Sequence, residues 1–109
     1  MPRSVDLLQG TVDVLILRTL AWAPMHGYEI SRWIRERSRD VLAIEGAALY
    51  QGLHRLERRH WVSCYWGVSE NNRRAKYYEL TALGKRQLRA ESEQWRTYAD
   101  AVFRVLDPA

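Results

Sequence analysis

The chain has 109 residues, and 17 basic against 13 acidic residues give it a formal net charge of +4 at pH 7. This size suits one domain with one extra element, and the basic balance is compatible with a nucleic-acid partner. The single cysteine, Cys64, excludes an internal disulfide and a zinc cluster of cysteines. With no signal-peptide pattern and no apolar run long enough to cross a bilayer, we expect a cytoplasmic protein without a membrane partner.

The positive charge is concentrated between Gln51 and Lys76. Six basic residues and two acidic ones in this stretch give a balance of +4, which equals the net charge of the whole chain. Among the 17 basic residues only Lys76 and Lys85 are lysines. Arginine suits phosphate and guanine because its planar fork donates two parallel hydrogen bonds. A GC-rich genome would produce the same arginine bias, so arginine usage alone does not decide between the two explanations.

The first helix is predicted over residues 11–22. Its apolar residues recur at helical spacing: Val12, Ile16 and Leu20, with Val14, Leu17 and Ala21 as a second stripe. A helix that is apolar on two sides is expected to pack on its own domain and on a partner chain, the latter through Leu15. The alternative is a central core helix without partner contact.

The second helix is predicted over residues 28–37, after Pro24 has ended the first. Its inward stripe consists of Ile30, Trp33 and Ile34. The outward arginines of this helix suit phosphate contact or a solvated polar face equally well, because acidic residues lie among them.

The third helix is predicted over residues 47–59, and it contains most of the residues expected to contact DNA. Its buried stripe is Leu49, Gly52, Leu53, Leu56 and His60. An α-helix fits the major groove of B-DNA, and its first turns reach the base edges. The residues expected to contact DNA are Ala47, Tyr50, Gln51, His54, Arg55 and Arg58. Two alternatives stay open: Tyr50 packs at the junction between helix and hairpin, and Arg58 only complements the helix dipole.

Two strands follow, predicted over residues 61–68 and 74–80. The residues between them, Ser69 to Arg73, have turn chemistry, and either asparagine can take a left-handed conformation. Three cations, Arg73, Arg74 and Lys76, lie at or just after the hairpin tip. We expect them to contact phosphates or the minor groove.

The last helix is predicted over residues 82–106, with Thr81 as its N-cap. At 1.5 Å per residue it is about 37 Å long, which is more than a small wing domain can cover. Its apolar stripe has heptad-like spacing, which indicates pairing between two chains. The residues expected at the dimer contact are Leu88, Trp95, Tyr98, Ala99, Val102 and Leu106. The alternative is a helix folded back on its own domain.

No catalytic or metal site is expected. His26, His54 and His60 lack the spacing of zinc ligands, and the chain has no nucleophile-elbow serine or phosphate-binding glycine loop. From the predicted helices and strands, the expected fold class is mainly α with a small β-hairpin wing. We expect residues 1–80 to form a winged helix-turn-helix DNA-binding domain and residues 81–109 to form a C-terminal dimerisation helix, and we expect no cofactor.

In order and spacing, several fragments resemble the PadR family of bacterial transcriptional regulators, in the short form with one C-terminal helix. They are Gly10-Thr11 with the LRTL run, Pro24 to Ile30, Leu49-Tyr50, Leu53, Arg55-Leu56-Glu57, Arg73 to Tyr78 and Leu80 to Gly84. The sequence departs from the family pattern at two places. Gln51 stands where many members have proline, and His60 stands where many have a helix-ending glycine.

The resemblance implies a homodimeric repressor whose third helix reads the major groove and whose C-terminal helices pair. It carries Tyr50 over as a DNA contact and Arg73, Arg74 and Lys76 as the basic wing. Some members, the multidrug-responsive repressors, hold flat aromatic drugs between tryptophans of the paired helices, and Trp95 occupies the matching position. Trp95 is thus a candidate platform for a planar aromatic ligand, or it only fills the dimer interface.

Other functions remain open on the sequence alone. A dimer that senses or sequesters aromatic compounds would use the tryptophans and bind no DNA. A protein-interaction module would not need the basic excess between Gln51 and Lys76. A sequence-neutral DNA-binding protein would show a flat preference across random duplexes.

Overall fold

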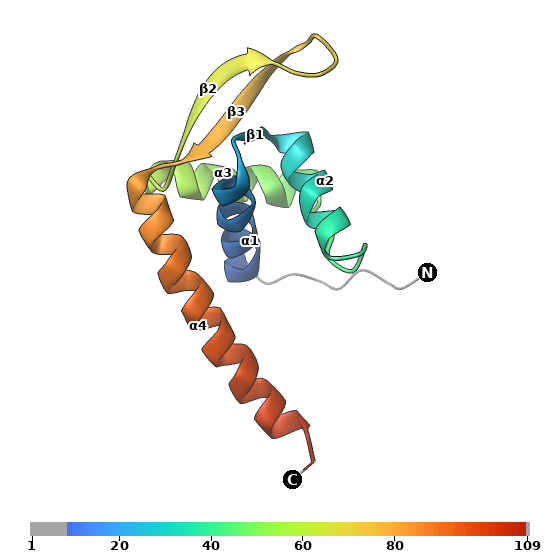
Figure 1. The fold of residues 1–109 in the computed structure, drawn as a ribbon, viewed down its shortest axis with the longest axis vertical. Coiled ribbons are helices and arrows are strands. Elements are labelled where there is room, and N and C mark those ends of the chain that lie inside the picture. Colours follow the sequence, from blue (N-terminus) through green and yellow to red (C-terminus); the bar gives the residue numbers. More distant parts are fainter. Residues whose placement is uncertain (1–8, 109) are drawn as a thin grey trace.

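The structure, a computed structural model, describes residues 9–108. Its elements are α1 (Gln9–Trp22), β1 (Met25–His26), α2 (Gly27–Arg37), α3 (Gly46–Arg58), β2 (Val62–Val68), β3 (Arg74–Leu80) and α4 (Ala82–Leu106). In Figure 1, α1, α2 and α3 form the body, the β2–β3 hairpin lies above it, and α4 runs away from it. The predicted fold class, mainly α with a small β wing, is confirmed.

A third strand was missed by the sequence prediction. β1 has two residues and pairs antiparallel with β3 through Met25–Tyr78 and His26–Tyr77, so the sheet order is β1-β3-β2. Two residues are too short for an alternating pattern, and only the neighbouring strand makes them extended and paired. Through β1 the hairpin is hydrogen-bonded to the residues that lead into α2.

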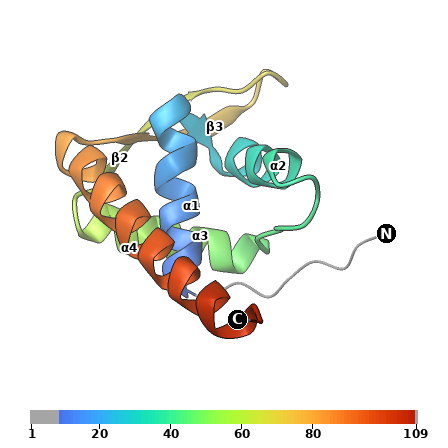
Figure 2. The same ribbon diagram turned by 60° about the horizontal axis from the view of Figure 1, so that its bottom comes forward.

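The core lies where the first three helices meet the base of the sheet. The residues that are almost completely buried include Ile16, Leu17, Ile30, Leu53 and Leu56. α1 is the central helix: it packs against α2, α3, α4 and β3 (Figures 1 and 2). Among the residues of α1 whose burial is described, two polar side chains are buried, and both have partners. Thr19 donates to the carbonyl of Leu15 at 2.8 Å, and Asp13 receives Arg55 of α3.

The end of α3 corrects one prediction. His60 was assigned to the buried stripe, but it is exposed and has a left-handed backbone with φ of 62°. Its N–H donates to Glu57 O and the next N–H, of Trp61, donates to Leu56 O, which is the Schellman pattern that usually uses glycine. Thr81 Oγ1 donates to the carbonyl of His60 at 2.7 Å and supports this turn. Histidine therefore ends the helix in the conformation that glycine adopts more easily.

The start of α4 is tied to the same corner. Thr81 is the N-cap, as predicted, because its side chain accepts a hydrogen bond from Gly84 N. Gly84 lies directly on the backbone of Trp61: a Cβ built there would lie 2.0 Å from Trp61 O and 2.9 Å from Trp61 C. The absence of a side chain at Gly84 lets α4 begin against the α3–β2 turn.

The apolar stripe of α4 divides into two halves. Leu88, in its first half, is 9% exposed and belongs to the core of its own domain. Beyond Trp95 the stripe is largely uncovered within the single chain, and α4 extends past the body in Figure 1. The radius of gyration, 15.0 Å, exceeds the value of about 13 Å expected for a compact chain of this length. None of the helices in residues 9–108 combines the length and apolar character needed to cross a lipid bilayer.

Candidate nucleic-acid interface

The two faces of α3 are clearly separated. Leu49, Leu53 and Leu56 are buried, and Gly52 allows the close approach of α1, since a Cβ there would lie 2.9 Å from Ile16 Cδ1. On the other face several predicted contact residues are exposed: Ala47, Tyr50, Gln51, His54 and Arg58. The helix thus presents a methyl, an amide, an imidazole and a guanidinium group to solvent on one side. Side chains of these kinds contact base edges and phosphates in protein–DNA complexes.

Tyr50 packs between helices, in line with the alternative interpretation of its role. Its phenol ring lies over Gly27 at the start of α2, where a Cβ would be 2.5 Å from the tyrosine hydroxyl oxygen. The residue is nevertheless 50% exposed. Tyr50 therefore packs against the start of α2 while about half of its surface remains exposed.

Arg55 differs from the other predicted DNA contacts. Its Nη2 donates to Asp13 Oδ1 at 2.7 Å and its Nε donates to Oδ2 at 3.4 Å. The two side chains are 16% and 10% exposed, so this is an inward-facing pair that joins α3 to α1. Arg59 Nη1 lies 3.8 Å from the same carboxylate. The structure thus turns Arg55 away from the exposed face, and we leave it out of the interface.

The hairpin consisting of β2, β3 and the turn between them is called the wing below. Asn72 takes the left-handed conformation in its turn, with φ of 58°. Arg73 and Arg74 are exposed, as expected for cations that meet phosphate. Lys76 is not equivalent to them: its Nζ lies 3.7 Å from Glu57 Oε1 on α3, and its side chain is 33% exposed. Lys76 therefore connects the wing to α3.

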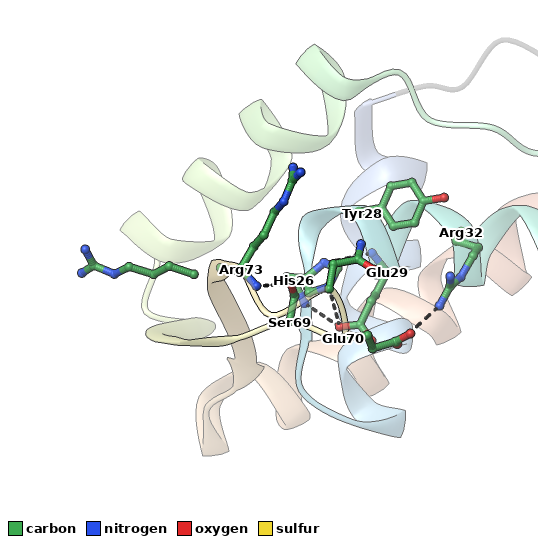
Figure 3. Close-up of a pocket in the computed structure, with 10 residues that line it drawn as sticks. His26, Tyr28, Glu29, Arg32, Ser69, Glu70 and Arg73 are labelled. Atoms are coloured by element: carbon green, nitrogen blue, oxygen red, sulfur yellow. Dashed lines mark hydrogen bonds and ion pairs between the residues drawn. The ribbon is translucent and has the colours of Figure 1, made fainter.

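Figure 3 shows the hollow between the wing tip and the start of α2. It has a volume of about 340 Å³ and is lined mainly by polar side chains. Arg32 Nη2 lies 3.9 Å from Glu70 Oε1 across it, so the one acid of the turn is directed towards α2. Arg73 points away from this pair (Figure 3). At the tip of the wing Glu70 is therefore directed towards α2, and Arg73 is not paired with it.

Cys64 lies in the same corner as Lys76, and its thiol is hydrogen-bonded to Glu57. Its Sγ donates to Glu57 Oε2 at 3.4 Å. Burial, followed by the hydrogen bond and the charge of Glu57, raises the pKa of the Cys64 thiol. This shift disfavours the thiolate, which is the nucleophilic form of a cysteine. Within residues 9–108 no group of three or more potential metal ligands comes together.

The predicted dimer residues do not all lie on a free surface. Leu88 is buried in its own domain, so it is not available to a partner. Trp95, Tyr98 and Leu106 are 44%, 59% and 69% exposed. Ala99 and Val102 are half-buried, and Leu15 is half-buried against the core. Phe103 and Val105 were not predicted from the heptad spacing; they are 58% and 84% exposed and widen the uncovered apolar surface beyond the heptad positions.

A three-helix body with a β-hairpin and an exposed polar face on its third helix is the arrangement of a winged helix-turn-helix protein. The sequence matches the Transcriptional regulator PadR-like family over residues 16–90. The chain belongs to the PadR family of transcriptional regulators. Regulators of this class are in general not enzymes, and the membership supports regulation through DNA binding.

Similar proteins agree with this membership. A transcriptional regulator from Clostridium thermocellum has a TM-score of 0.84 and 30% identity, covering 96% of this chain and 99% of that one. A PadR family transcription regulator from Clostridium difficile has a TM-score of 0.75 and 30% identity, covering 88% of this chain and 98% of that one. An "Uncharacterized protein X" of Lysinibacillus sphaericus is 36% identical over 95 residues, which are 87% of this chain and 86% of that protein.

Proposed function

We propose that this chain is a sequence-specific, homodimeric repressor that acts on DNA in the cytoplasm. Residues 1–80 would form the DNA-binding unit, and residues 81–109 would form the dimerisation helix. The observation that carries the proposal is the contact between Lys76 of the wing and Glu57 of α3. It places Lys76, one of the wing cations, beside the exposed face of α3. One surface then offers base-reading groups and phosphate-binding groups together.

In the proposed complex each protomer places one α3 in the major groove. The two grooves would be successive ones on one face of the DNA, about 34 Å apart. Gln51 is exposed on the first turns of α3 and suits adenine, and Ala47 suits a thymine methyl group. Arg73 and Arg74 would contact the phosphates or the minor groove beside that site.

The variant with both Arg73→Ala and Arg74→Ala is expected to bind all duplexes more weakly, because each arginine neutralises a phosphate whatever the sequence. The slope of log affinity against log salt should fall by about two, one for each lost phosphate contact. Fluorescence anisotropy across a salt series, with the duplex upstream of the chain's own gene, measures this. Gln51→Ala should instead change the ranking among duplexes.

A matched control replaces two exposed arginines of α4, Arg89→Ala with Arg104→Ala, and removes the same charge from the molecule. It should keep the wild-type salt slope. An equal loss of slope in both double variants would refute the wing assignment. Wild-type affinity that does not depend on salt would refute the proposed function itself.

The homodimer is proposed from the uncovered half of the α4 stripe. Val102→Glu with Leu106→Glu is expected to give a folded monomer, because it places charges on that surface while the domain core is untouched. Thr97→Glu with Arg104→Glu is the control, since both residues are exposed and helical spacing places them on the opposite side of α4. Sedimentation equilibrium reports the mass. A wild-type chain that is monomeric at micromolar concentration would contradict the dimer.

We assign Trp95 to the dimer contact. Its indole Nε1 donates to Thr11 Oγ1 of α1 at 3.0 Å, which fixes the orientation of the ring. The second candidate role of Trp95 is to bind a planar aromatic ligand. It is favoured by two hollows of about 320 and 310 Å³ beside Trp95, which are lined by residues of α1 and α4 and, in the second hollow, also by Leu42. In that case ligand binding would relieve repression by changing how the two α4 helices pair.

A further inference from the structure

The two faces of the wing are unequal. On one face Tyr65 stacks on Tyr77 with ring centroids 5.6 Å apart, and Tyr77 meets His26 of β1 at 5.4 Å. That face is occupied by aromatic contacts within the fold. The opposite face continues outward from Cys64 and Tyr78, and it carries Trp66.

Trp66 and Val68 are uncovered although they are large and apolar. They are 59% and 65% exposed. Strand alternation and the register of the hairpin put them on the same face as Arg74 and Lys76: Trp66 pairs with Lys76, and Val68 pairs with Arg74. Apolar and cationic side chains therefore alternate on a surface next to α3.

Arg74 is held by the tryptophan. Its guanidinium carbon lies 4.3 Å from the centroid of the Trp66 ring, which is the closest of the cation–ring contacts in residues 9–108. The contact limits the number of conformations available to a long side chain. The carboxylates of the wing lie elsewhere, since Glu70 is directed towards Arg32 and Glu79 belongs to the opposite face.

Charge decides which partner suits this surface. Arg73, Arg74 and Lys76 would repel the same surface of a second copy, and they would attract a polyanion. DNA offers phosphates to the cations and apolar deoxyribose edges to an indole ring, a combination that aromatic and basic side chains recognise together. The surface also continues the exposed side of α3 through the contact between Lys76 and Glu57.

We infer that Trp66 is a DNA-contact residue. Its indole packs on the deoxyribose wall beside the groove that α3 enters, and it holds Arg74 in place to meet a phosphate. This inference rests on the proposed DNA-binding function. It adds a contact that carries no charge, which distinguishes Trp66 from the arginines of the wing.

Trp66→Ala tests the inference. Binding to the chain's own upstream duplex is expected to weaken about tenfold, in the range found when an aromatic side chain that contacts nucleic acid is removed. The salt slope should change by much less than in Arg74→Ala, because no cation is lost. Trp66→Phe should recover most of the affinity, since it retains a ring under Arg74. The double variant Trp66→Ala with Arg74→Ala should lose less affinity than the product of the losses in the two single variants, because the two side chains act together.

Tyr65→Ala is the matched control, because Tyr65 is an exposed aromatic residue of the same strand on the other face. It should bind within about twofold of the wild type, as expected for a side chain without DNA contact. Equal affinity of Trp66→Ala and Tyr65→Ala, with both variants shown by circular dichroism to be folded, would overturn the inference. A wild-type chain that binds no duplex would instead refute the proposed function, so the two failures are distinct.

Discussion

Gly84→Ala is expected to lower the free energy of unfolding by about 3 kcal/mol, the size of a severe overpacking effect. The added Cβ would lie 2.0 Å from Trp61 O, and that oxygen belongs to the backbone, so no rotation of a side chain relieves the contact. The same oxygen accepts a hydrogen bond from the N–H of Thr81. Moving it would disturb the junction of α3, β2 and α4 as a unit.

Helix propensity predicts the opposite sign. Alanine in place of glycine inside a helix stabilises it by up to about 1 kcal/mol. The experiment therefore decides between a local effect and a tertiary one. Urea denaturation at fixed protein concentration gives the midpoint and the slope for each variant.

Gly46→Ala is the control for this experiment. Gly46 also lies in the first turn of a helix, and a Cβ there meets nothing within 4 Å. It should leave the midpoint unchanged or raise it. A Gly84→Ala protein as stable as the wild type would show that α4 does not begin against Trp61 in the way described.

Asp13→Ala is expected to cost about 3 kcal/mol, because it leaves the inward-facing guanidinium of Arg55 without its carboxylate. The two side chains are only 10% and 16% exposed, so solvent compensates the lost interaction poorly. The pair joins the central helix α1 to the recognition helix α3, and its loss should weaken that packing. The midpoint of urea denaturation measures the effect.

Two further variants separate the pair from a general effect of charge. Glu36→Ala removes an acid whose side chain is 71% exposed and lies 3.9 Å from Arg32, so it should change stability by less than about 1 kcal/mol. Asp13→Leu combined with Arg55→Leu removes both charges and should cost less than Asp13→Ala alone. If Asp13→Ala and Glu36→Ala were equally mild, the pair would not be a structural contact.

The helices and the hairpin could be predicted because their signals are local. The spacing of Leu49, Leu53 and Leu56 and the alternation around Trp66 depend on neighbours a few residues away, and the structure contains those elements. The N-cap at Thr81 was predicted for the same reason. β1 could not be predicted in this way, because its two residues are extended only through their pairing with β3.

The candidate interface was predicted less completely. Arg55 looked like a DNA contact because it flanks the polar face of α3, yet its partner Asp13 is 42 residues away in the chain. Leu88 looked equivalent to Trp95 because both belong to one heptad stripe, but the first is buried by its own domain. Trp66 and Tyr65 are adjacent in sequence, and only the register of the sheet shows which of them shares a face with Arg74.

By itself the amino-acid sequence determined the order of the four helices and the two hairpin strands, the concentration of positive charge between Gln51 and Lys76, and the family. These depend on short-range periodicity and on composition, which folding does not alter. The tertiary structure alone decided which charged and apolar groups remain available: Arg55 is paired, Lys76 is shared with Glu57, and the second half of α4 is largely uncovered. The physical reason is that ion pairing and burial depend on which distant segments meet, and that is settled by packing in three dimensions.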